Sequence, residues 1–453
     1  MALESLPDDS AVPIEVRFGL SVNACLDYLN YDRLGKNEIH KHLVDGHVKS
    51  KPAAHKWLFP ARIRPKAFGW KSSRAAVQRI KEALAEIGSV ARHDAILAAE
   101  GSVRLIERLS PALEQVDSSS GALGSAVNRA IEVLVPLIAA APVPSQVREQ
   151  WLDRLFAAHE ADGVPYIESL TDYWGELCGT RELASVWADR LLGITQLALS
   201  DDKSLRGHFH GTTACLDALL RAERYEELYD LLRLEQFWPN KRWAVKALAA
   251  QGKADEAILL AESSRGPWTN DTDVNLLCEG ILLSLGRIEE AYRHYGLYAH
   301  QGGTYLATFR SIAKVYPSLP RAQILSDLIE GSPGDEGKWF ATAKELGMYE
   351  AALRLVRESP CDPKTLTRAA RDFVELEPSF ALGAGLAALR WLTHGHGYEI
   401  SSIDVWSAYH STLKAAEHLG TLNDTKLTIR QLVAQEAVGG FVRQILGREL
   451  ELT

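Results

Sequence analysis

The 453-residue sequence predicts an all-α protein, in which helix hairpins stack into an array after a less regular helical N-terminal region. Two observations carry this prediction. From about residue 73 onward, apolar residues recur at helical spacing, and no run of alternating apolar and polar residues indicates a strand. In the second half of the chain, four segments align with one another without gaps, which indicates a repeated structural unit.

The first predicted helix follows a basic N-terminal segment. Residues 73–91 place Ala76, Ile80, Leu84 and Ile87 on one face, which is typical of an amphipathic helix.

Two more helices are expected before the array. One runs through residues 103–116, and the turn signal DSSSG follows it at 117–121. Residues 126–142 are apolar enough for a buried helix, and APVPS at 141–145 is the best linker candidate. The sequence therefore predicts three parts: a basic, partly irregular segment at 1–72, N-terminal helices at 73–141 and a helical-repeat array at 145–453.

The aligned segments share a helix–turn–helix pattern. Their turns fall at Glu223, Gly252, Gly286 and Gly347, and one further turn at 316–320 gives a period of roughly 30 to 34 residues. The segments are LLRAERYEELYDLL at 219–232, LAAQGKADEAILLA at 248–261, LLSLGRIEEAYRHY at 282–295 and the segment at 343–356.

Each part of this pattern has a physical role. Glycine supplies the left-handed residue that ends the first helix, and the acidic residues after it suit the start of the second. Ala257, Ala291 and Ala352 are small enough to let the paired helices approach closely. Because one helix pair cannot bury both faces, neighbouring pairs are expected to stack into a superhelix. The alternative is an irregular helical bundle whose hairpins share turn chemistry.

The repeat resembles the tetratricopeptide (TPR) family. The matching residues are Gly286, Ile288, Glu290, Ala291 and Tyr295 in one unit, and Gly347, Tyr349 and Ala352 in another. The sequence departs from the family where Val245, Glu279 and Phe340 replace an early small residue. The stretch that begins at SQVREQW, residues 145–151, is also similar to an uncharacterised group of bacterial helical-repeat proteins. These resemblances imply an irregular TPR-like α-solenoid.

Composition bounds the class of protein. The chain has 50 Lys and Arg against 59 Asp and Glu, and 46% of its residues are hydrophobic, which is typical of a globular protein. Five scattered cysteines without a Cys-x-x-Cys motif indicate a reducing cytoplasm. The longest apolar run, 133–144, is shorter than the roughly 20 residues that a membrane span needs, so no membrane helix is expected. The acidic start MALESLPDDS does not predict a signal peptide.

The N-terminal segment stands apart from this acidic background. Residues 33–81 contain thirteen Lys and Arg against only Glu38 and Asp45. Within them, residues 55–74, here called the strap, interleave basic and aromatic side chains, and Pro60 and Pro65 disfavour a regular helix. The candidate binding residues of the strap are Lys56, Trp57, Arg62, Arg64, Lys66, Trp70, Lys71 and Arg74.

Two interpretations of the strap remain open. Basic groups with aromatic faces are what single-stranded RNA or DNA requires. Alternatively, the aromatic side chains pack on the first helices while the cations pair with acidic groups or dock on an acidic partner. We expect the four aromatic side chains, Trp57, Phe59, Phe68 and Trp70, to be mostly buried.

A second candidate surface comes from helix starts that carry cations. Such cations oppose the helix dipole, so they suggest either a carboxylate- or phosphate-binding groove rim or ion pairs between repeats. The predicted rim residues are Lys241, Arg242, Trp243, Lys338, Trp339 and Lys364.

Three histidine pairs stand two residues apart, at 40–42, His208 and His210, and His394 and His396. On a helix such pairs do not share a face, and no carboxylate or cysteine stands at a confirming spacing, so no metal is predicted.

The sequence contains no recognisable catalytic constellation, so no enzymatic activity and no cofactor are predicted. Repeat arrays offer long binding surfaces. The sequence therefore predicts a cytoplasmic, non-enzymatic scaffold or adaptor for a protein partner, with no membrane partner. The alternative is a repeat protein that binds single-stranded nucleic acid through residues 55–74.

Overall fold

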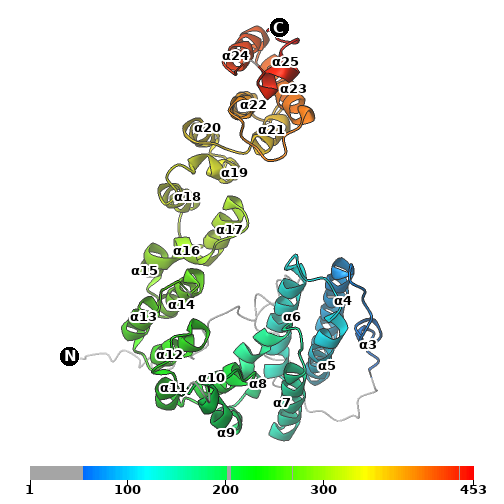
Figure 1. The fold of residues 1–453 in the computed structure, drawn as a ribbon, viewed down its shortest axis with the longest axis vertical. Coiled ribbons are helices and arrows are strands. Elements are labelled where there is room, and N and C mark those ends of the chain that lie inside the picture. The colour runs from blue at the N-terminus through cyan, green and yellow to red at the C-terminus, as the bar shows by residue number, and fades with distance from the viewer. Residues whose placement is uncertain (1–54, 201, 203–205, 268, 438, 453) are drawn as a thin grey trace, which may run out of the picture. The chain divides into compact units, whose positions relative to one another are not determined.

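The computed structural model describes residues 55–200, 202, 206–267, 269–437 and 439–452. These residues form helices, turns and loops and contain no strand, which confirms the all-α prediction. The chain divides into two compact units, at residues 1–286 and 287–453 (Figure 1).

Besides its α-helices, the described part of the first unit contains a 3₁₀ turn, Glu168–Tyr173. Its α-helices are α3 (Phe59–Arg62), α4 (Ser73–Ala91), α5 (Ala95–Leu113), α6 (Ala122–Ala139), α7 (Ser145–Glu160), α8 (Trp174–Cys178), α9 (Arg181–Ala198), α10 (Thr212–Arg221), α11 (Tyr225–Leu232), α12 (Trp238–Ala250), α13 (Ala254–Glu262) and α14 (Asp271–Ser284).

The α-helices of the second unit are α15 (Ile288–Ala291), α16 (Leu297–Ala299), α17 (Tyr305–Val315), α18 (Arg321–Glu330), α19 (Phe340–Glu345), α20 (Tyr349–Glu358), α21 (Pro363–Asp372), α22 (Pro378–Thr393), α23 (Ser402–His418), α24 (Leu422–Ala434) and α25 (Phe441–Leu446).

Helices α4, α5 and α6 pack against one another at the start of the first unit (Figure 1). Helix α4 has the predicted bounds, and its predicted apolar face is buried. Helix α5 begins earlier than expected because the Asp94 side chain caps it, accepting a hydrogen bond from the Leu97 amide at 2.8 Å. A continuous hydrophobic core then extends from Trp57 to Ala247.

Helix α6 is apolar enough to raise the question of a membrane. By length and composition alone it could cross a bilayer, although the sequence predicts no membrane helix. In the structure it packs on α4 and α5, and 44% of its 18-residue window is buried. Because the core helix of a globular unit passes the same test, this finding is weak evidence for a membrane span.

The segment at 141–145 connects α6 to α7 within the first unit. The buried guanidinium of Arg148 donates hydrogen bonds to the carbonyl oxygens of Ile138 at 2.9 Å and Ala141 at 2.7 Å. It therefore adds a further donor to carbonyls at the end of α6 and in the linker that already accept backbone hydrogen bonds.

The predicted hairpin turns are confirmed. Each joins two helices through three residues, and the middle residue is left-handed, with φ of 58° at Glu223, 78° at Gly252, 70° at Gly286 and 72° at Gly347. The turn at 316–320 likewise connects α17 to α18.

The hydrogen bonds at these turns explain why a left-handed residue is needed. In the Gly252 turn, the Lys253 amide donates to the Leu248 carbonyl at 3.0 Å, and the Gly252 amide donates to the Ala249 carbonyl at 3.0 Å. This Schellman pattern satisfies the last carbonyls of α12. Gly420, with φ of 68°, forms an equivalent turn between α23 and α24 that the sequence comparison did not include.

Glu223 adopts the left-handed conformation without being glycine. Arg181 of α9 donates to the Ala222 carbonyl at 3.0 Å and pairs with the Glu223 carboxylate at 2.7 Å. The neighbouring helix therefore holds this turn in a conformation that a residue with a side chain disfavours.

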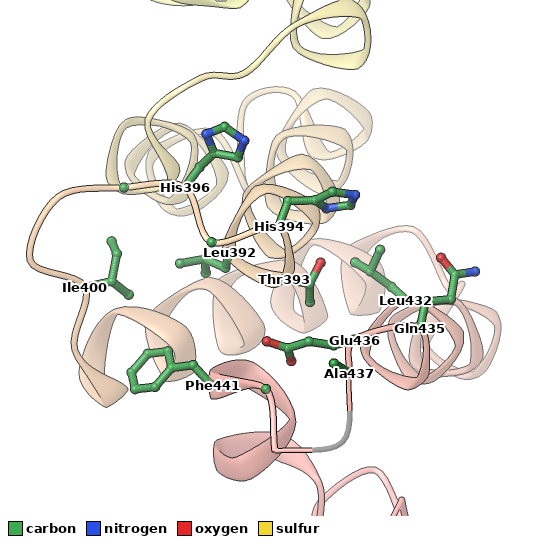
Figure 2. Close-up of a pocket in the computed structure, with 13 residues that line it drawn as sticks. Leu392, Thr393, His394, His396, Ile400, Leu432, Gln435, Glu436, Ala437 and Phe441 are labelled. Atoms are coloured by element: carbon green, nitrogen blue, oxygen red, sulfur yellow. The ribbon is translucent and has the colours of Figure 1, made fainter.

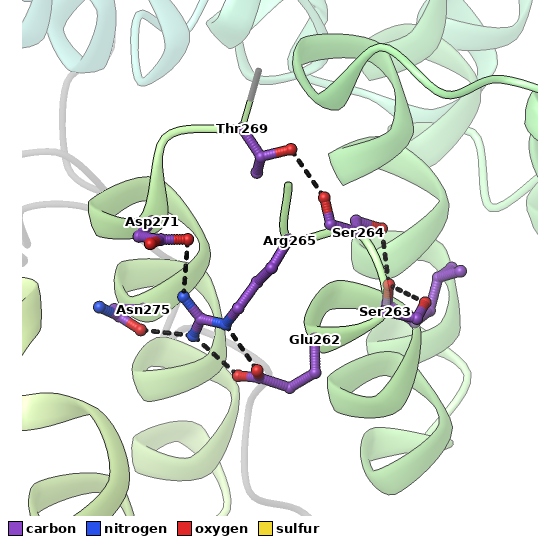
Figure 3. A network of polar contacts seen from close by, with 8 residues as sticks. Glu262, Ser263, Ser264, Arg265, Thr269, Asp271 and Asn275 are labelled. Carbon is purple, nitrogen blue, oxygen red and sulfur yellow. Dashed lines mark hydrogen bonds and ion pairs between the residues drawn. The ribbon is translucent and has the colours of Figure 1, made fainter. Parts of the chain in front are cut away.

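Arg265 ties the end of α13 to the start of α14 (Figure 3). Its guanidinium donates to the Glu262 carboxylate at 2.6 and 2.9 Å, to Asp271 at 3.2 Å and to the side-chain oxygen of Asn275 at 2.6 Å. One side chain thus fixes the connection between consecutive hairpins.

The second unit contains an irregularity that the repeat pattern did not predict. After the short α15, the chain forms a π-helical turn over Tyr292–Gly296, so the helix expected through Tyr295 is interrupted. A Cβ atom at Gly296 would lie 2.8 Å from the Tyr316 ring. The absence of a side chain at Gly296 therefore allows Tyr316 to pack tightly here.

The turn conformation can be tested with two glycines that both have free space around them. Gly252 is left-handed, whereas Gly193 lies inside α9, and a Cβ atom at either position would meet nothing within 4 Å. We expect Gly252→Ala to lower the free energy of unfolding by about 1 kcal/mol and Gly193→Ala to raise it by about 0.5–1 kcal/mol. Denaturant unfolding measures both, and equal effects would contradict the role of the turn.

Candidate interaction surfaces

The strap is fastened to the first helices by its aromatic side chains. Only Phe59–Arg62 forms a short helix, α3, as the prolines predict. Trp57, Phe59 and Phe68 are buried, which confirms the expectation for three of the four aromatic side chains. Trp57 lies on α5 where Gly101 leaves room, because a Cβ atom there would be 2.4 Å from its ring.

The acidic residues of α4 are used to hold the strap. The Glu86 carboxylate accepts hydrogen bonds from the amides of Leu58 at 2.6 Å and Phe59 at 3.1 Å. Glu82 pairs with Arg62 at 3.1 Å and Arg79 at 2.6 Å. These contacts leave Glu82 and Glu86 committed to the strap and to α4 itself.

Most of the basic residues between 55 and 81 remain exposed. Six of them form no ion pair with any described residue, and the fourth aromatic side chain, Trp70, is 66% exposed. These six cations are Lys56, Arg64, Lys66, Lys71, Arg74 and Lys81. These six exposed cations and Trp70 are here called the basic face.

In the first unit, the predicted groove-rim residues make contacts within the fold. Arg242 of α12 pairs with Asp172 at 2.5 Å, and its guanidinium carbon lies 5.5 Å from the Trp243 ring centroid. Trp243 is fully buried, and Lys241 is half-buried. The contacts of Arg242 fit the ion-pair interpretation.

In the second unit, the prediction for Lys338 needs a correction. Lys338 lies in a 3₁₀ turn, Glu336–Trp339, so it precedes α19 instead of occupying its first turn. Its ammonium pairs with Asp335 at 2.9 Å, and Trp339 is buried.

Lys364 lies in the first turn of α21, as predicted. Its ammonium donates to the Glu399 carbonyl at 3.0 Å and lies 3.8 Å from the Asp404 carboxylate. These neighbours offset the unfavourable position of the cation at a helix start.

The histidine pairs lie in different environments. The pair at 40–42 is outside the described residues. The rings of His208 and His210 are 4.6 Å apart, and the buried His159 places its Nε2 2.9 Å from the His210 carbonyl. Among the described residues, no group of three or more His, Cys, Asp or Glu side chains is placed to hold a metal ion.

His394 and His396 line a cavity of about 740 Å³ in the second unit (Figure 2). The cavity lies where α22 and α24 end and α25 begins. Glu436 also lines it, and its carboxylate accepts hydrogen bonds from the Val442 amide at 3.3 Å and the Arg443 amide at 2.7 Å. Phe441 completes one wall and is 45% exposed. The cavity therefore combines a fixed carboxylate with an aromatic edge.

Sequence reasoning missed a charged pair inside the first unit. Asp217 of α10 accepts a hydrogen bond from the Gly175 amide at 2.7 Å, and burial raises the pKa of Asp217 to about 7 against the opposing effect of Lys246. Burial also lowers the pKa of Lys246, whose ammonium lies 3.8 Å from the Trp243 ring centroid.

The surroundings of this pair are rich in ionisable groups. Asp172 and Glu176 both act on Asp217 and raise its pKa further. Burial, together with Glu132 and these two carboxylates, raises the pKa of Tyr173 to about 12.

A sequence signal for this pair existed. Asp217 stands six residues before Glu223, and Lys246 stands six residues before Gly252, so the two charges occupy the same repeat position. Both interrupt otherwise apolar runs. Opposite charges at one position of consecutive hairpins could therefore have indicated a contact between α10 and α12.

The four described cysteines are buried and form no disulfide, while Cys25 lies outside the described residues. Burial raises the pKa of Cys215 to about 11 and that of Cys361 to about 12. It also raises the pKa of Cys178. Thiols in this state are poor nucleophiles.

The packing of Trp57 on Gly101 can be tested with a second glycine pair. Gly101 and Gly124 both lie inside helices, but only at Gly101 does an added methyl group meet the tryptophan ring. We expect Gly101→Ala to lower the free energy of local opening of the strap by about 1–3 kcal/mol. Limited trypsin digestion at Arg62 and Lys66 measures this opening.

Gly124→Ala is the control and should leave the cleavage rates unchanged. Equal cleavage of both variants and the wild type would show that Trp57 does not hold the strap.

The raised pKa of Asp217 predicts a specific pH dependence. Between the unfolded value near 3.8 and the folded value near 7, the folded state binds more protons, so the free energy of unfolding falls as pH rises. Asp217→Asn removes this pH-dependent fall in the free energy of unfolding. From pH 5 to pH 8 we expect the variant to gain about 1–2 kcal/mol relative to the wild type.

Denaturant unfolding across this pH range tests the prediction, with the exposed Asp230→Asn on α11 as a control. Lys246 contributes with the opposite sign, because its folded pKa is lowered. A difference that does not change with pH would contradict the burial of the Asp217 carboxylate.

Comparison of the chain with models of known protein families, with curated proteins and with solved structures found no match.

Proposed function

We propose that the chain is a non-enzymatic scaffold, built as an irregular TPR-like α-solenoid, that binds a partner protein. The recurrent left-handed turns support the repeat part of this proposal. The small residues Ala257, Ala291 and Ala352, which the repeat pattern places between paired helices, are all fully buried. Close helix pairs joined by identical turns are the building blocks that such arrays require.

Two features of the second unit support a binding function. They are its cavity and the exposed apolar side chains of the same region. Tyr398, in the loop that lines the cavity, is 81% exposed. Ile403, at the start of α23 just beyond this loop, is 78% exposed, and Phe441 itself is part of the wall. Exposed large apolar side chains near a cavity are candidates for contact with a partner.

The chemistry of the cavity indicates the kind of segment that would bind. Phe441 offers an apolar contact, while the carboxylate of Glu436 offers a polar one. An extended or helical segment with a large apolar side chain, flanked by hydrogen-bonding groups, fits these features. The four reduced cysteines support a cytoplasmic location for this complex.

Affinity purification from the source cells, with the full chain as bait, tests the proposal. We expect Tyr398→Ala combined with Phe441→Ala to reduce recovery of the partner at least tenfold, because central apolar contacts each contribute about 1–2 kcal/mol or more. Circular dichroism should show that the variant remains folded, since both side chains are exposed.

The matched control is Leu259→Ala, which removes an exposed apolar side chain from α13 in the first unit. It should leave partner recovery unchanged. Recovery that is equal for all three proteins would place the interaction elsewhere and would contradict a binding role for the cavity.

A further inference from the structure

We propose that the basic face of the first unit binds single-stranded nucleic acid at the N-terminal end of α4. In this site, Lys71 and Arg74 contact phosphates and Trp70 stacks on a base. The proposal concerns a different unit from the protein-binding cavity, so either one can fail without the other.

The charge balance of this region is the first argument. Residues 55–81 contain eight Lys and Arg and no Asp or Glu. The two carboxylates of α4, Glu82 and Glu86, already hold Arg62, Arg79 and the backbone of the strap. The Asp117 carboxylate, next to Trp70, accepts a hydrogen bond from the Ser119 amide at 2.9 Å. The remaining six cations are thus left without an ion pair among the described residues, on a chain whose net charge is −9. Uncompensated cations in one short stretch attract a polyanion.

The start of α4 provides the second argument. Its N-cap residue, Ser72, makes no side-chain hydrogen bond to the helix, because its hydroxyl oxygen accepts one from the Gly69 amide at 3.3 Å instead. No acidic residue lies in the first turn of α4, and Arg74 lies there. An anion beside Lys71 and Arg74 would therefore meet two cations and the positive end of a 19-residue helix.

The third argument is that Trp70 is held in place while its ring is exposed. The Trp70 carbonyl accepts a hydrogen bond from the Asp117 amide at 2.8 Å. On the other side, the Ser72 amide donates to the Gly69 carbonyl at 3.0 Å. The backbone on both sides of Trp70 is thus fixed, and its 66%-exposed indole offers a preorganised face for stacking.

These features favour a single strand over other anionic partners. In a duplex the bases are stacked inside, so an exposed indole finds no free face. An acidic protein surface would engage the cations but gives Trp70 no ring to stack on. A bilayer would take up several apolar side chains, whereas Leu58 and Trp70 are the large ones exposed among residues 55–81.

The test is a fluorescence anisotropy titration of a labelled 20-nucleotide oligouridylate with the full chain, at several KCl concentrations between 50 and 300 mM. The logarithm of the association constant should fall linearly with the logarithm of the salt concentration. Because each phosphate contact contributes about 0.7 to the slope on single strands, Lys71→Gln combined with Arg74→Gln should reduce its magnitude by about 1.4.

Trp70→Ala should act differently. It should weaken binding by about 5- to 150-fold at every salt concentration and leave the slope unchanged, because stacking releases no counterions. Trp70→Phe should restore part of this affinity. Since Trp70, Lys71 and Arg74 are exposed, these variants are expected to keep the thermal midpoint of the wild type.

The matched control for charge is Lys426→Gln combined with Arg448→Gln, which removes two exposed cations from the second unit. It changes the net charge by the same amount and should leave both affinity and slope as in the wild type. An equal loss in this control and in the Lys71 and Arg74 variant would overturn the site.

Three other outcomes would also overturn the proposal. One is the absence of binding to the oligouridylate at 50 mM KCl. Another is displacement of the oligonucleotide by polyglutamate at equal charge concentration with no effect of Trp70→Ala, which would identify an acidic-protein surface. The third is cosedimentation with vesicles that contain 30% phosphatidylserine without any RNA binding, which would identify a membrane surface.

Discussion

The structure depends on stopping a helix and reversing the chain within three residues. At Gly252 the reversal uses one left-handed residue and two backbone hydrogen bonds that close the end of α12. These two bonds satisfy carbonyls that the end of a helix otherwise leaves without an intrahelical partner. The same solution recurs at Gly347 and Gly420, so the spacing of these turns determines where each pair of helices begins.

Charged residues serve two different purposes in the first unit. Around the strap, Glu82 pairs with Arg62, and Glu86 accepts a hydrogen bond from the strap backbone. The surplus cations face solvent. Between α10 and α12, by contrast, Asp217 and Lys246 are partly buried, and each shifts the protonation of the other. Surplus charge at a surface suits an external partner, whereas a partly buried pair contributes to how two hairpins recognise one another.

Much of the secondary structure could be predicted from the sequence, because helical spacing and turn glycines are local signals. The bounds of α4 and the turn at Gly286 followed directly from such signals. The π-helical turn at Tyr292–Gly296 did not, because it accompanies tight packing of Tyr316, which stands twenty residues beyond Gly296.

The candidate sites were harder to predict, since the sequence does not show which charges meet. Arg242 finds its carboxylate in Asp172, seventy residues earlier, and this contact makes a predicted rim cation part of the fold. The buried thiols can be used to follow local opening of each unit. Cys178 and Cys215 lie in the first unit and Cys361 in the second. A thiol-specific reagent reaches each of these cysteines only when the surrounding helices open. The rate of labelling at each cysteine therefore measures how often the helices around it in its own unit open.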